Sequence, residues 1–280
     1  MPVRFNRLLY FARLMMLAAL FLGGIPESAA AEEKAEKSPE TKDASWEYAY
    51  EVSVGSAYVW RGLNLLGEGN QHYSPGVYMP SFFASRGAFS LGWASALQLG
   101  GANLGRNVDA AAGMEQDFYV EAEKEWKHGL SVLAAATLYG FPASRKKAAG
   151  ADRAAYVEPG AGLKWDWKIN CSLKVFWFHG IQETLQTGDY AYLYASASKE
   201  WEPVARWTLK LHLEGGRKWY LQEDISDNMW DVQLNASAKR AVSDSLTLGV
   251  QASAAWSNFA GKSALQETAL WALATLSLSW

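Results

Sequence analysis

The chain ends in Leu270-Trp-Ala-Leu-Ala-Thr-Leu-Ser-Leu-Ser-Trp280, a stretch in which large apolar and small residues alternate. Successive side chains of a β-strand point to opposite faces, so the even positions from Leu270 to Trp280 share one apolar face. Thr275, Ser277 and Ser279 form much of the other face. Such a strand is typical of the closing strand of a bacterial outer-membrane β-barrel. A strand of a soluble sheet can show the same alternation, so the rest of the chain has to decide.

The same period of two recurs along the chain, in segments that are bounded by turn residues. Twelve strands are predicted, at residues 46–62, 75–85, 88–100, 115–126, 130–141, 154–166, 171–182, 190–201, 207–215, 229–240, 246–257 and 266–280. Their connections alternate between short turns and longer loops, as in outer-membrane barrels. The sequence therefore predicts an all-β fold, a transmembrane antiparallel up-and-down β-barrel of about 12 strands. An even count places both termini on the periplasmic side.

Tryptophan lies mostly near the ends of the predicted strands, as expected for aromatic girdles at the two membrane interfaces. Those expected at the periplasmic rim are Trp46, Trp126, Trp165, Trp167, Trp201, Trp207 and Trp280, and those expected at the outer rim are Trp60, Trp177, Trp219, Trp230 and Trp256. A soluble β-sandwich with an aromatic core is the alternative. It does not explain why so many tryptophans lie at strand ends.

The N-terminal region divides into two segments ahead of the predicted barrel. Residues 1–31 combine three arginines, a short apolar stretch and the small residues Ala29-Ala30-Ala31, which is the pattern of a cleaved signal peptide. Residues 32–45 are rich in Glu, Lys, Ala and Ser and predict a disordered periplasmic tether. The barrel then covers residues 46–280. Localisation in the bacterial outer membrane follows from export and from this fold.

Composition excludes several classes of function. The net charge of −3 leaves no basic surface of the kind that nucleic-acid binding needs. Cys171 is the single cysteine, so there is no internal disulfide, and no pair of histidines has the spacing of a metal site along a strand. We therefore expect no nucleic-acid partner, no metal and no cofactor.

The candidate functional residues are charged residues at the alternate strand positions that are expected to face the lumen. An acidic row on the fourth predicted strand contains Glu115, Asp117, Glu121, Glu123 and Glu125, all at odd positions. Basic and acidic residues of the same parity on later strands face it. The candidate lumen-lining residues are Arg61, Glu121, Glu123, Lys174, Lys210 and His212. Rows of charge in a lumen can select ions and polar solutes, but paired charges can also fill a narrow barrel. For Arg61, a structural salt bridge is the alternative to a role at the pore entrance.

The opening of the predicted barrel resembles a known family. The segment Val54-Gly-Ser-Ala-Tyr-Val-Trp-Arg-Gly62, then Ser74-Pro75-Gly76-Val77 and Gly92-Trp93-Ala94-Ser95, resembles the first three strands of the TorF-like family of outer-membrane porins. Ala57 stands where that family commonly has Asp. The resemblance covers about 50 residues, and it implies an outer-membrane barrel with channel function, no defined substrate and no catalytic residues.

The predicted function is an outer-membrane channel for passive, restricted diffusion of small hydrophilic solutes or ions. The expected partners are these solutes, outer-membrane lipid and lipopolysaccharide, and the export and barrel-assembly machinery. The alternative is a non-transport barrel with a structural, adhesive or scaffold role. An outer-membrane lipid hydrolase built on His179 with Ser172 or Ser196 is a further reading, which no local motif supports, so we expect no enzyme.

Overall fold

The computed structural model describes residues 45–57, 59–60, 63–64, 76–99, 114–141, 154–180, 189–220, 229–258 and 268–280. The predicted signal peptide, almost all of the predicted tether and Arg61 lie outside these residues. All regular structure within them is β-structure. Among the same residues there is no helix long and apolar enough to cross a membrane.

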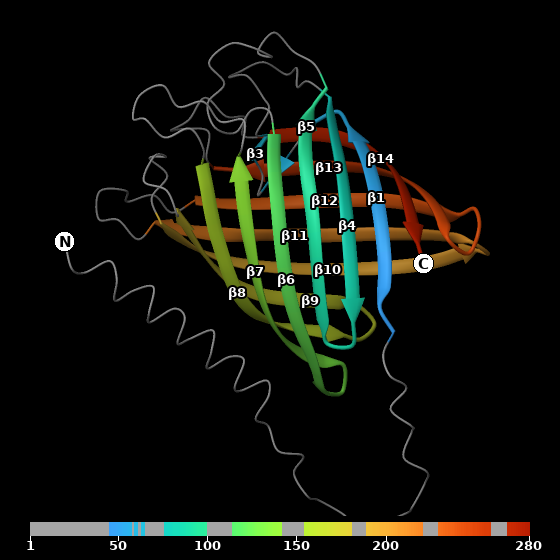
Figure 1. Cartoon of the computed structure of the whole chain (residues 1–280), viewed down its shortest axis with the longest axis horizontal. Coiled ribbons are helices and arrows are strands. Elements are labelled where there is room, and N and C mark those ends of the chain that lie inside the picture. The colour runs from blue at the N-terminus through green and yellow to red at the C-terminus, as the bar shows by residue number, and fades with distance from the viewer. Residues whose placement is uncertain are drawn as a thin grey trace, which may run out of the picture. The chain divides into compact units, whose positions relative to one another are not determined.

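Twelve of the described strands close into one antiparallel barrel (Figure 1). They are β1 (Glu47–Gly55), β4 (Val77–Arg86), β5 (Phe89–Gln98), β6 (Met114–Lys127), β7 (Leu130–Phe141), β8 (Ala154–Asp166), β9 (Asn170–Gly180), β10 (Tyr190–Val204), β11 (Trp207–Tyr220), β12 (Met229–Ala241), β13 (Leu246–Ser257) and β14 (Thr268–Ser279). From β4 to β14 each strand pairs with the next, and β1 closes the ring by pairing with both β4 and β14. A closed ring leaves no unpaired sheet edge, which removes the cost of exposed backbone groups in lipid. The predicted fold class is confirmed.

Five short turns join strands at one end of the barrel, which we call the short-turn end. They follow β4, β6, β8, β10 and β12. The turn after β6 shows why some of these connections can be so short. His128 and Gly129 have φ angles of 56° and 74°, as a two-residue hairpin turn of type I′ requires. A Cβ atom on Gly129 would also collide with the Asp166 carbonyl oxygen, so glycine is needed there.

The register of the pairs decides which side chains face outward. Residues directly opposite each other on neighbouring strands share a face. On β14, Leu270, Leu276 and Leu278 lie on the outer face and are exposed, as the alternation predicted. Trp271, at an odd position, faces inward and is only 7% exposed. The seven tryptophans predicted for the periplasmic rim are all exposed at the short-turn end.

Two predicted strand boundaries are wrong. The first strand was predicted to run from 46 to 62, but β1 ends at Gly55, and a separate two-stranded hairpin follows, of β2 (Val59–Trp60) and β3 (Leu63–Asn64). The ninth strand was predicted to end at 215, but β11 continues to Tyr220. Gly215 and Gly216 suggest a loop by composition, yet both are paired with β10 and β12. Tertiary pairing overrides their weak strand preference.

Candidate functional site: the barrel interior

The interior of the barrel carries most of the charge of the strands. By register, the inward-facing carboxylates of the described strands are Glu47, Glu51, Glu115, Asp117, Glu121, Glu123, Glu125, Glu158, Asp166, Glu200, Glu214 and Asp231. The inward-facing lysines are Lys164, Lys174, Lys210, Lys218 and Lys239. These positions hold twelve carboxyl groups against five lysines, an excess of seven acidic groups. The interior is therefore an acidic, polar environment.

Two cavities lie along this interior. The larger, of about 640 Å³, is bordered by side chains from β6 to β12 and by Val59 of β2. The smaller, of about 460 Å³, lies at the short-turn end. Lys210 borders both cavities, and its Nζ lies 2.8 Å from Glu200 Oε1. This ion pair therefore lies at the junction between the two cavities.

Two further ion pairs span several strands along the inner wall. Lys174 Nζ on β9 lies 3.5 Å from Glu121 Oε2 on β6, and Lys164 Nζ on β8 donates to Glu123 Oε2 at 3.0 Å. On the two intervening strands, Ala135 lies opposite Glu121 and Gly162 lies opposite Lys174. A Cβ atom on Gly162 would lie only 2.9 Å from Lys174 Cγ, so glycine allows the lysine side chain to lie along the wall. Small residues in the wall thus let long charged side chains lie along it.

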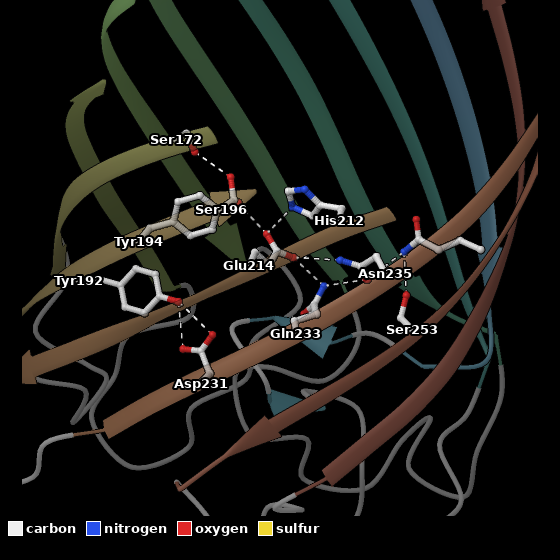
Figure 2. A network of polar contacts seen from close by, with 11 residues as sticks. Ser172, Tyr192, Tyr194, Ser196, His212, Glu214, Asp231, Gln233, Asn235 and Ser253 are labelled. Carbon is white, nitrogen blue, oxygen red and sulfur yellow. Dashed lines mark hydrogen bonds and ion pairs between the residues drawn. The ribbon is translucent and has the colours of Figure 1, made fainter. Parts of the chain in front are cut away.

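Glu214 on β11 accepts hydrogen bonds from three neighbouring side chains on two strands (Figure 2). The Tyr194 hydroxyl donates to Oε2 at 2.7 Å, and the amides of Gln233 and Asn235 donate to Oε1 at 2.7 and 3.3 Å. His212 Nε2 lies 3.2 Å from Oε2. The contacts continue to β13, where Gln251 donates to both Asn235 Oδ1 and Ser253 Oγ. Donors from both sides therefore fix this carboxylate on the cavity wall.

An aromatic cluster lines the inner wall away from the short-turn end. Its buried members are Tyr156, Phe178, Tyr190 and Tyr192, with Tyr139, Phe176, Tyr194 and Tyr220 packed against them. The ring centroids of Tyr156 and Phe178, and those of Phe178 and Tyr190, are 4.6 Å apart in stacked pairs. Lys218 Nζ lies 3.8 Å from the centroid of the Tyr190 ring, a cation–π contact. This wall is closely packed, and the Lys218 ammonium group lies against it.

The structure places five of the six candidate residues on inward-facing positions. Glu121 and Lys174 form one of the ion pairs above, Glu123 pairs with Lys164, Lys210 with Glu200, and His212 with Glu214. Arg61 lies outside the described residues. Whether any of them controls permeation stays a prediction.

Glu214 was not among the candidates. Its inward parity is visible in the sequence, but the convergence of donors from β10 and β12 depends on register, which alternation alone does not give.

The histidine and the serines of the predicted lipid-hydrolase alternative do not come together. Ser172 and Ser196 face inward and bond to each other at 2.8 Å, whereas His179 is on an outward position, where its Nδ1 lies 2.8 Å from Asp189 Oδ2. His212 Nδ1 is buried without a hydrogen-bond partner, so no described serine hydroxyl bonds to it there. No group of three or more His, Cys, Asp or Glu residues in the described part of the chain has the arrangement of a metal site.

Fold and interior together define a closed antiparallel β-barrel with an apolar outer face and an acidic, polar lumen. No protein-family model matches the chain. No curated protein matches its sequence either.

Solved structures with a similar fold include outer-membrane proteins. The KdgM porin in complex with disordered oligogalacturonate has a TM-score of 0.47 at 8% identity, covering 84% of this chain and 99% of that one. LpxR from Salmonella typhimurium has a TM-score of 0.47 at 9% identity, covering 82% and 99%. Outer-membrane expressed OmpT of Vibrio cholerae has a TM-score of 0.44 at 6% identity, covering 85% and 97%. At these scores and identities none of the three lends the chain a function.

Proposed function

We propose that this protein spans the bacterial outer membrane as a non-enzymatic channel for restricted, passive diffusion of small hydrophilic solutes, with a preference for cations. The observation that carries the proposal is the cavity of about 640 Å³ inside a closed barrel whose inward positions hold seven more carboxylates than lysines. An acidic lumen attracts cations and repels anions. The resemblance to the TorF-like porins points the same way and is part of the proposal.

The composition of the outer face suits contact with lipid. At the paired positions of the twelve strands, the outward charged side chains are basic, without a carboxylate among them: Arg86, Lys124, Lys199, Arg217 and Arg240. Three of them lie over rings of tryptophans near strand ends. The distance from the cationic group to the ring centroid is 5.7 Å for Lys199 and Trp201, 5.6 Å for Arg240 and Trp207, and 5.2 Å for Arg217 and Trp219. Cations beside interfacial tryptophans suit the phosphates of lipid headgroups. Phospholipid and lipopolysaccharide are the partners that this surface fits.

The experiment that tests the function is single-channel recording of the refolded mature protein in a planar lipid bilayer, with folding verified by heat-modifiable gel migration. We expect discrete conductance steps and, in a salt gradient, a reversal potential that favours cations. A folded barrel that carries no current contradicts the channel. An anion-favouring reversal potential contradicts the role given to the acidic lumen.

Glu214→Gln tests the contribution of one fixed charge. Glutamine keeps the side-chain volume and removes the charge, which at about 4 Å from an ion in water contributes about 1 kcal/mol. We therefore expect the cation-to-anion permeability ratio to fall by about fivefold. Glu47→Gln is the matched control, because it makes the same chemical change at an exposed position at the start of β1. An equal effect of both variants would show that Glu214 has no special place in the permeation path.

A non-transport barrel is the second candidate, and the aromatic cluster favours it. Eight aromatic residues from β7 to β11 pack on the inner wall, and four of them are buried. A lumen filled in this way can serve as a rigid scaffold whose work is done elsewhere. If the protein is folded but conducts no current in the bilayer experiment, this role is favoured.

A further inference from the structure

We infer that the β2–β3 hairpin lies inside the barrel and forms the constriction of the lumen, and that Val59 is the residue that sets the free width there. This inference rests on the proposed channel function. It names a specificity-determining element that lies outside the twelve-stranded wall.

The chain leaves the wall directly after β1. Pairing of β1 with both neighbours ends at Gly55, which lies opposite Val77 and Leu273. Ser56 still hydrogen-bonds to the wall: its amide donates to the Ala272 carbonyl at 3.0 Å, and its Oγ accepts from the Ala272 amide at 3.1 Å. The Ser56 hydroxyl thus accepts a hydrogen bond from the Ala272 amide in place of a backbone carbonyl, and regular strand pairing ends here. The residues that follow are free to take another course.

That course leads to the inner side of the wall. Ala57 is only 4% exposed and packs in one cluster with Ala255, Ala269 and Trp271, and Val59 lies against the same cluster. By register these three wall residues are inward-facing positions of β13 and β14. Burial of the Ala57 methyl and of part of Val59 against Trp271 holds this segment inside. The short strands of the hairpin accordingly lie within the outline of the barrel (Figure 1).

Val59 also reaches the cavity that the opposite wall encloses. Among the described residues that border the cavity of about 640 Å³, Val59 is the one that does not belong to β6–β12. The others include Glu121, Lys174 and Glu214. Val59 packs against β13 and β14 and also borders the cavity of β6–β12. It therefore lies between the β13–β14 wall and that cavity.

The β2–β3 hairpin is wide enough to narrow the lumen beside Val59. Val59 is paired with Asn64 and Trp60 with Leu63, so two antiparallel backbones lie side by side there. Neighbouring strands are about 4.8 Å apart, so the hairpin takes the room of two backbones rather than one. A permeating solute is therefore confined between the apolar side chain of Val59 and the acidic wall of β6–β12. This arrangement admits small or extended solutes and favours cations on the wall side.

Cysteine modification in the bilayer tests the inference, in a Cys171→Ser background so that each variant has one thiol. Val59→Cys is treated with a methanethiosulfonate reagent that carries a trimethylammonium group. We expect conductance to fall by about half or more, because the added group occupies the narrowest part of the path. Ser198→Cys, on the cavity wall, is the positive control. Val54→Cys, outward-facing and 45% exposed, is the negative control and is expected to keep its current.

An unchanged current in modified Val59→Cys, together with block of Ser198→Cys, would overturn the inference. A second readout does not depend on conduction. In folded protein, a bifunctional methanethiosulfonate with a spacer as long as the cavity is wide should link Val59→Cys to Ser198→Cys but not Val54→Cys to Ser198→Cys. This cross-link in a barrel without current would place the hairpin inside and refute the channel, whereas its absence would refute the internal hairpin.

Discussion

In the proposed channel, replacing Glu121 and Glu123 together by lysine is expected to reverse the ion preference from cations to anions. Each substitution changes the lumen charge by two units and leaves a former partner, Lys174 or Lys164, without its carboxylate. A unit charge about 4 Å from an ion in water contributes about 1 kcal/mol, so a change of four units, about 4 kcal/mol, should shift the cation-to-anion permeability ratio by up to about a thousandfold. The measurement is the reversal potential in a salt gradient.

A charge swap is the control for this prediction. Glu121→Lys combined with Lys174→Glu keeps both the pair and the net charge, so the ion preference should stay that of the unmodified protein. If the swapped barrel folds and still changes its preference as strongly as the double lysine variant, local geometry rather than charge controls selectivity. If the double lysine variant folds and keeps its cation preference, ions do not pass this part of the wall.

Gly216→Ala is expected to destabilise the barrel and displace Tyr192. A Cβ atom at Gly216 would collide with the Leu193 carbonyl oxygen and with the ring of Tyr192, which lies over this glycine. From there the Tyr192 hydroxyl donates to both carboxylate oxygens of Asp231, at 3.0 and 2.9 Å, across the intervening strand β11. Overpacking of this kind costs about 1–3 kcal/mol, and the backbone oxygen has little room to move. The free energy of unfolding in urea, followed by heat-modifiable migration, measures the loss.

Gly140→Ala is the matched control for this substitution. Gly140 also lies in a strand, but the nearest atom to its Cβ position is the Gln116 carbonyl oxygen at 3.5 Å, an ordinary contact. We expect stability within about 0.5 kcal/mol of the unmodified protein. Equal losses for both alanines would mean that strand glycines matter through backbone freedom and not through the space that Tyr192 requires.

The outer surface and the barrel itself could be predicted from the sequence because their cause is local. Alternation in Leu270–Trp280 fixes one apolar face whatever the neighbouring strands are, and lipid demands such a face along every strand. The same reasoning placed Glu121, Glu123, Lys174, Lys210 and His212 inward, where the structure has them. It failed at Gly55, since the alternation continues through residues 56–60 although the chain has already left the wall.

The sequence by itself determined the closed barrel, its strand number and the sidedness of its charges, since each depends on a period of two along a single strand. It also predicted the tryptophans of the short-turn end, though not the place of Trp60, which lies in the β2–β3 hairpin. Only the tertiary structure decided which charges meet, because Glu121 reaches Lys174 over two intervening strands, and Glu214 collects donors from both neighbours. Such contacts depend on register between strands and on glycines that leave room for long side chains. The inward course of the chain after Gly55 likewise rests on Trp271, more than 200 residues away in the sequence.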